Sequence, residues 1–243
     1  MPYRRLPNTD NARFKALKNA LEKGKELPPF KLAFSQQTFQ KVLSFLPTFE
    51  QTILLQKQAY TFQVEKNKDY QQTLRKAKLY ISHFIQVLNM AILRAELPEN
   101  TRSYYGLRSY GKNVPPLNTE TEILTLGQKL IDGETTRLRE GLSPITNPTV
   151  AVIKVRYEQF LDAYKFQKTL QKRNHYNLEK LASFRSKADD IILSIWNEVE
   201  KTYRDLPDDL KREKAKQYGI VYIFRKNEIT KISRFETNQK EIG

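Results

Sequence analysis

The chain has 243 residues, with 42 lysines and arginines against 27 aspartates and glutamates, which gives a formal net charge of +15. It contains no cysteine, and this excludes disulfide bonds, zinc-thiolate sites and thiol catalysis. Because the charged N-terminus is followed by no apolar run and no stretch approaches the ~20 apolar residues of a membrane span, we expect a cytoplasmic protein without membrane association.

The first predicted element is a short helix within a basic N-terminal arm, residues 1–34. Asn8 or Thr9 can cap the start of this helix, and Pro28-Pro29 stops it. A second short helix is expected from Ser35 to Pro47. The long helix that follows should begin at a capping box, Thr48-Phe49-Glu50-Gln51, and it meets no glycine or proline before Pro98.

A second long helix repeats the first about a hundred residues later. The motif Ala59-Tyr60-Thr61-Phe62-Gln63 recurs as Ala163-Tyr164-Lys165-Phe166-Gln167. This helix should open at Asn147-Pro148 and end before Pro207. A duplicated helical unit cannot bury its apolar face alone, so we expect the two copies to pack together and to bury Ile81 and Ile192. The predicted fold is all-α, an elongated helical bundle or antiparallel coiled coil.

The remaining segments complete one structural domain with a repeated organisation. The first helical repeat and a basic loop take residues 35–118, and the second repeat takes residues 119–205, opening with a shorter helix capped by Thr119-Glu120-Thr121-Glu122. Residues 206–243 contain a charged helix that Gly219 stops, followed by a small β-hairpin of Ile220–Phe224 with Ile229–Ser233.

Polar residues interrupt the apolar seam of both long helices at matching places. Three interpretations remain open: a hydrated or register-fixing polar layer, a turn that folds each long helix into a hairpin near Asn67 and Asn174, or a buried ligand site. The polar residues are Gln56, Gln63 and Asn67 in the first helix, and Gln167, Gln171 and Asn174 in the second.

No cluster of residues has a catalytic signature. The stretch Gly106–Asn113 matches a phosphate-binding P-loop except at Asn113, but it follows a helix rather than a strand. His83 and His175 lack the Glu-x-x-His spacing of di-iron bundles. We therefore expect a protein that is not an enzyme, with no cofactor and no metal.

Three segments interleave tyrosines with positive charge, the combination that stacks on bases and neutralises phosphates in single-stranded nucleic acid and RNA loops. If the two copies packed in parallel, the second and third segments would lie at the same end of the bundle. The candidate nucleic-acid-binding residues are Tyr3, Arg4 and Arg5; Tyr104, Tyr105, Arg108, Tyr110 and Lys112; and Tyr222, Arg225 and Lys226.

The two ends of the chain resemble an uncharacterised family of helical proteins from Bacteroidota bacteria. The resemblance lies in Tyr3–Asp10, in Arg212–Ala215 and in Tyr218–Tyr222. It implies a bacterial, cytoplasmic, helical protein, and it brings no activity or site residues.

The hypothesis that follows is a non-enzymatic protein that binds nucleic acid or ribosomal RNA through its basic, tyrosine-containing surface. The alternative is a protein-interaction or scaffold module that uses an apolar helical groove or self-association.

Overall fold

The computed structural model describes residues 3–224, which form two compact units. Of these residues, 3–58 and 175–224 belong to unit 1, and Ala59–Asn174 form unit 2. Each unit thus combines part of the first sequence copy with part of the second. The elements are β1 (Tyr3–Arg4), α1 (Asp10–Glu26), η1 (Pro29–Lys31), α2 (Gln36–Leu93), η2 (Glu99–Tyr105), η3 (Arg108–Tyr110), α3 (Glu120–Arg139), α4 (Val150–Thr202), α5 (Asp208–Lys216) and β2 (Tyr222–Ile223).

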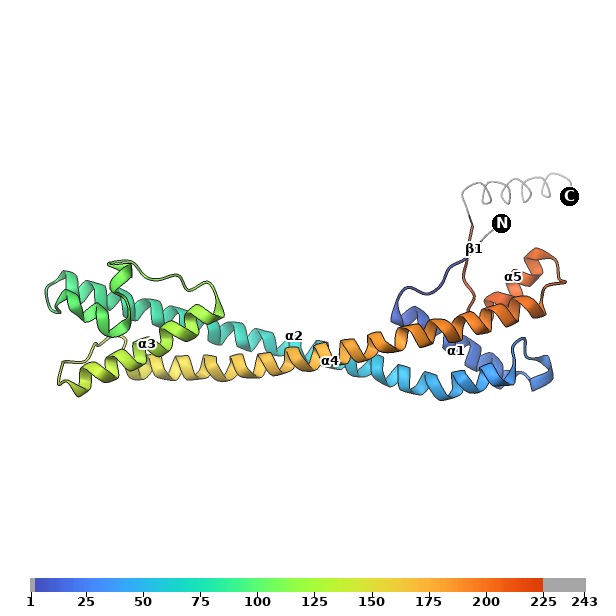
Figure 1. The fold of residues 1–243 in the computed structure, drawn as a ribbon, viewed down its shortest axis with the longest axis horizontal. Coiled ribbons are helices and arrows are strands. Elements are labelled where there is room, and N and C mark those ends of the chain that lie inside the picture. The colour runs from blue at the N-terminus through green and yellow to red at the C-terminus, as the bar shows by residue number, and fades with distance from the viewer. Residues whose placement is uncertain (1–2, 225–243) are drawn as a thin grey trace, which may run out of the picture. The chain divides into compact units, whose positions relative to one another are not determined.

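The predicted all-α fold is confirmed, and within each unit α2 and α4 pack antiparallel (Figure 1). In unit 2, Gln63 contacts Asn174 whereas Tyr70, further along α2, contacts Phe160, which lies earlier in α4. The parallel packing considered from the sequence is therefore wrong. As a result, the segments that follow α2 and α4 belong to different units.

The predicted break at Pro47 is also wrong, because α2 continues through this residue. Proline inside a helix leaves a carbonyl without its donor and costs about 3 kcal/mol. The neighbouring Phe45, Leu46 and Phe49 are all buried, and their packing offsets this cost. The predicted capping box at Thr48 does not form, since Thr48 lies in the interior of α2.

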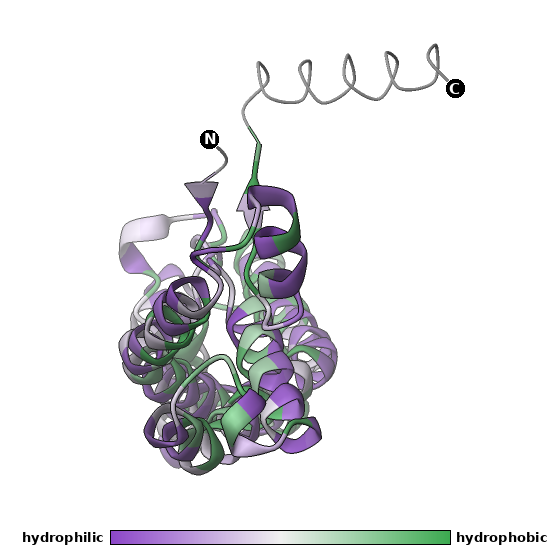
Figure 2. Ribbon diagram, turned by 90° about the vertical axis from the view of Figure 1, so that its right-hand side faces the viewer, coloured by the Kyte–Doolittle hydropathy of each residue, from purple (hydrophilic) through white to green (hydrophobic). Residues whose placement is uncertain are grey.

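Each unit has its own apolar core, as expected for amphipathic helices, along which hydrophobic and hydrophilic residues alternate (Figure 2). Ile192 and Trp196 lie in the core of unit 1, and Ile81 and Phe84 lie in that of unit 2; none is more than 1% exposed. The predicted arm is part of unit 1, because α1 contributes Leu17 to the core.

Bidentate ion pairs also hold α1 against α4. The Arg13 guanidinium donates to Asp189 at 2.8 and 3.0 Å, and that of Arg185 donates to Asp10 at 2.9 Å through both nitrogens.

Two predicted helix starts and one predicted stop are confirmed. Thr9 caps α1, a capping box of Thr119 and Glu122 opens α3, and Gly219 follows α5 with a φ of 82°. The predicted start of α4 is wrong by one short turn: the helix begins at Val150, and the Asn147-Pro148 peptide that precedes it is cis.

The small sheet pairs the two ends of the described chain. β2 matches the first strand of the predicted hairpin, and it pairs antiparallel with β1, Tyr3 opposite Ile223 and Arg4 opposite Tyr222. Figures 1 and 2 show the two short strands side by side. The predicted second strand, Ile229–Ser233, lies outside the described residues.

The polar seam is a layer of amide pairs between α2 and α4. Asn174 Nδ2 donates to Gln63 Oε1 at 2.9 Å, and Gln167 Nε2 donates to Asn67 Oδ1 at 3.4 Å. Both helices run through this region, so the hairpin turns near Asn67 and Asn174 do not form. The paired amides favour the register-fixing layer over a ligand site.

Candidate functional site

The β1–β2 sheet brings two of the three predicted tyrosine-basic segments together. Arg4 Nη1 donates to Asn197 Oδ1 at 2.8 Å and lies 3.4 Å from Glu200, while the Tyr222 hydroxyl donates to Glu200 at 2.7 Å. Burial and then the Glu200 carboxylate raise the pKa of Tyr222. Arg4 and Tyr222 therefore hold the sheet on α4. Among the described members of these two segments, Arg5 and the half-exposed Tyr3 face solvent.

A pocket of about 500 Å³ lies between this sheet, α1 and the residues after α5. We call it the α1 pocket. The Arg5 amide donates to the Val221 carbonyl at 2.9 Å, which extends the pairing of the sheet into the wall of the pocket. The pocket is lined by Arg5, Leu6, Pro7, Asn8, Ala12, Lys15, Ala16, Asn19, Lys216, Gly219, Ile220, Val221 and Tyr222.

Three cations from three separate elements converge on the α1 pocket. Arg5, Lys15 and Lys216 are exposed, and within residues 3–224 none of them forms an ion pair with a carboxylate. No aspartate or glutamate is among the lining residues. The amides of Asn8 and Asn19 add neutral hydrogen-bonding groups, so the pocket is suited to an anion.

The first residues of the second tyrosine-basic segment, Tyr104 and Tyr105, stabilise the fold of unit 2. Tyr105 is fully buried, and its hydroxyl donates to Glu134 and accepts from Arg137 Nη1 at 2.9 Å. Burial and the Glu134 carboxylate raise the pKa of Tyr105. The Tyr104 hydroxyl donates to Glu140.

The other members of that segment lie at the surface. Arg108, Tyr110 and Lys112 are exposed, with Tyr110 at 42%. The P-loop-like stretch contains η3, and the element immediately before it is η2 rather than the strand that a P-loop requires. Arg225 and Lys226 lie outside the described residues.

Tyr110 borders a smaller pocket of about 220 Å³ beside α3, which we call the α3 pocket. It is lined by Gly106, Tyr110, Pro115, Pro116, Thr121, Glu122, Thr125, Leu126 and Lys129.

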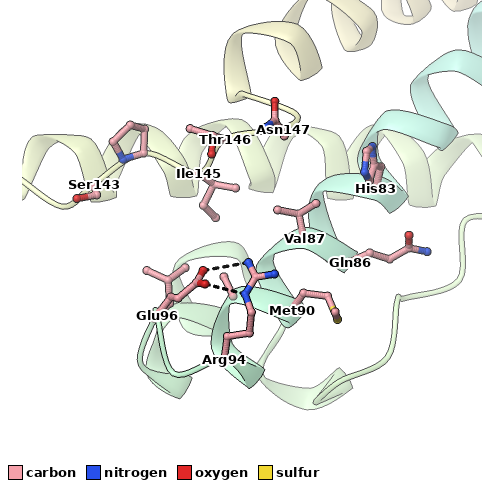
Figure 3. Close-up of a pocket in the computed structure, with 13 residues that line it drawn as sticks. His83, Gln86, Val87, Met90, Arg94, Glu96, Ser143, Ile145, Thr146 and Asn147 are labelled. Carbon is pink, nitrogen blue, oxygen red and sulfur yellow. Dashed lines mark hydrogen bonds and ion pairs between the residues drawn. The ribbon is translucent and has the colours of Figure 1, made fainter.

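The largest of these cavities, about 620 Å³, lies in unit 2 between the end of α2 and residues 143–147. Figure 3 shows Val87 and Met90 on one side of it, Ile145 and Thr146 on the other, and the guanidinium of Arg94 facing Glu96. Arg94 donates to Glu96 at 2.7 and 3.0 Å, so its charge is already compensated. His83 also lines the cavity, but nothing in its surroundings selects a class of ligand.

Sequence reasoning identified Arg5 but missed Lys15 and Lys216. The two lysines lie on helices whose charged residues are most simply read as a solvated face. The two lysines come near Arg5 through the packing of Gly219 on Ala16. This packing is close: a Cβ on Gly219 would lie 3.0 Å from Ala16 Cα.

Comparisons with family models, with curated proteins and with solved structures give no match for this chain. Among the described residues, no helix combines the length and the apolar content needed to cross a bilayer.

Proposed function

We propose that this protein is a non-enzymatic, cytoplasmic nucleic-acid-binding protein, and that the α1 pocket receives part of a single strand such as a ribosomal RNA loop. The observation that carries the proposal is the convergence of Arg5, Lys15 and Lys216 on a pocket without a lining carboxylate. The net charge of +15 adds long-range attraction for any polyanion.

The chemistry of the pocket matches a nucleotide better than a small inorganic anion. Lysine and arginine side chains neutralise phosphates, and the release of condensed counterions supplies most of the affinity. The pocket also has an apolar floor of Ala12, Ala16 and Ile220, against which a base or sugar can pack. A phosphate ion alone would not cover these apolar residues, so they would stay exposed to water.

The test is a fluorescence-anisotropy titration of a labelled single-stranded RNA of about 12 nucleotides at low salt. The triple variant Arg5→Glu, Lys15→Glu and Lys216→Glu should lose at least about tenfold in affinity. Absence of binding by the wild-type protein would end the proposal.

A matched control separates the pocket from overall charge. Lys57, Lys180 and Lys201 are exposed lysines of unit 1 that do not line the α1 pocket. Changing these three to Glu alters the net charge by the same amount as the pocket variant. If both variants lose affinity equally, the binding is a property of the charge and not of the pocket.

A second candidate function, self-association or a scaffold role, is favoured by one observation in unit 2. Phe62 and Phe166 are in mutual contact and yet 39% and 48% exposed. Light scattering after size-exclusion chromatography tests this alternative: a dimer that Phe62→Ser dissociates supports it, and a monomer at all concentrations excludes self-association.

A further inference from the structure

The helices that precede the two long helices, α1 and α3, are built alike, although the first repeat predicted from the sequence, residues 35–118, left α1 out. Each starts at a threonine whose hydroxyl accepts a hydrogen bond of 3.2 Å from the backbone amide of the third residue after the cap, Thr9 from Ala12 and Thr119 from Glu122. Counted from these caps, Leu17 and Gly127 occupy the same position, and both face the core of their unit. The helices are therefore equivalent parts of the duplication.

The segments that follow the two long helices are also equivalent. Tyr105-Gly106-Leu107 in unit 2 matches Tyr218-Gly219-Ile220 in unit 1. The tyrosine and the aliphatic residue are buried in both cases, and the glycines have φ values of 66° and 82°. Glycine adopts a positive φ readily because it has no Cβ. The two segments therefore share one backbone conformation, which a glycine makes possible in both.

The two pockets occupy equivalent places on these parts. In each, the glycine with positive φ lines the pocket together with one stripe of a helix, α1 for Gly219 and α3 for Gly106. The stripe is Ala12, Lys15, Ala16 and Asn19 in the α1 pocket, and Glu122, Thr125, Leu126 and Lys129 in the α3 pocket; the spacing from the threonine cap is the same. The duplication has therefore produced a pocket in each unit.

The α3 pocket has its own combination of cation and aromatic ring. Lys129 is exposed, and its Nζ lies 3.7 Å from the position that a Cβ on Gly106 would take. The Tyr110 ring and Pro115 supply flat apolar surface. The Glu122 carboxylate also lines the pocket, where it accepts 2.8 Å hydrogen bonds from the amides of Thr119 and Asn118, which lower its pKa; it therefore stays negatively charged and weakens the attraction of this pocket for phosphate.

We infer that the α3 pocket is a second site for single-stranded nucleic acid, with a phosphate at Lys129 and a base against Tyr110, so that one chain binds two short strands. The inference rests on the proposed function of the α1 pocket. Because the volume of the α3 pocket is 220 Å³ against 500 Å³, it takes the smaller part of a strand and is the weaker site.

The experiment is a calorimetric titration of the full chain with a single-stranded RNA of about six nucleotides, short enough to fill one site. The wild-type protein should bind two oligonucleotides per chain. The variant Tyr110→Ser with Lys129→Glu should bind one, and so should the variant Lys15→Glu with Lys216→Glu, each losing a different site. The control Tyr60→Ser with Lys165→Glu changes an exposed tyrosine and an exposed lysine of the same unit and should still bind two.

The outcomes separate the two proposals. No binding by the wild-type protein removes the proposed function itself. Binding of one oligonucleotide that only the Lys15 and Lys216 variant abolishes leaves the proposed function standing and overturns the second site. Circular dichroism verifies folding, and if Tyr110→Ser with Lys129→Glu does not fold, the single variant Lys129→Gln replaces it, with at least about a threefold loss of affinity expected at the weaker site.

Discussion

Phe62 and Phe166 hold the same place in the two copies of the repeated motif, and their rings contact each other edge to face, 6.4 Å apart at 88°. In an antiparallel pair of duplicated helices, equivalent residues meet only near the local symmetry point. The amide pairs Gln63 with Asn174 and Asn67 with Gln167 lie on either side of this contact. The contact therefore lies where the two copies of the motif meet.

This aromatic contact should be measurable as a coupling energy. Phe62→Ala and Phe166→Ala, alone and together, form a double-mutant cycle in which we expect a coupling of about 0.5–1 kcal/mol, because edge-to-face pairs contribute beyond their buried area. Urea denaturation gives the four free energies of unfolding. Strict additivity would mean that the two rings do not stabilise each other.

A buried ion pair holds unit 2 together and is the most sensitive point of its core. Glu134 and Arg137 are 0% and 1% exposed and 2.8 Å apart, and Glu134 also accepts from the Ile145 amide at 2.7 Å. Arg137→Met leaves the buried carboxylate unpaired, so we expect a loss of about 3–5 kcal/mol in the free energy of unfolding. The exposed Arg139→Met should change it by less than about 0.5 kcal/mol. Similar values for the two variants would contradict the importance of the pair.

The amide layer should cost stability in return for fixing the register. Gln167 is 4% exposed, its Nε2 makes a long bond of 3.4 Å to Asn67, and its Oε1 has no partner within the described residues. Replacing Asn67 and Gln167 together by Leu should raise the free energy of unfolding by about 1 kcal/mol. The exposed Gln171→Leu is the control. A lower midpoint of urea denaturation for the double variant would show that the amides stabilise the fold.

The free energy of unfolding should decrease at alkaline pH because several tyrosines are wholly or partly buried in the fold. Burial and a neighbouring carboxylate raise the pKa of Tyr105 and Tyr222, and burial with Tyr218 raises that of Tyr203 to about 12. The unfolded chain releases these protons near pH 10 while the folded chain keeps them. The stabilisation is thus complete below about pH 10 and falls as the pH rises through the folded pKa values.

The measurement is urea denaturation between about pH 8 and pH 11.5. The free energy of unfolding should decline above about pH 10, and Tyr222→Phe should decline less steeply. A flat profile across this range would contradict the assignment.

Periodicity and repetition predicted most of the fold. Thr9, Thr119 and Gly219 act as the sequence indicates, and Ile81 and Ile192 are buried. The errors arise where tertiary packing outweighs local preference. Pro47, for example, stays helical because its neighbours pack into the core.

The candidate site was less accessible from the sequence. Tyr105 and Arg108 look alike as members of one basic, aromatic segment, yet the first is buried against Glu134 and the second is exposed. Lys15 and Lys216 are far apart in the chain and meet only because Gly219 packs on α1. When single charged residues from distant parts of the chain line one pocket, no local sequence pattern predicts it.

The salt dependence of RNA binding tests the central claim most directly. If three phosphates meet Arg5, Lys15 and Lys216, the logarithm of the association constant should fall with the logarithm of salt concentration with a slope of about −2 from this pocket. Changing the three residues to Gln should remove that part of the slope. A slope that is the same in the wild-type protein and in the Gln variant would contradict the account.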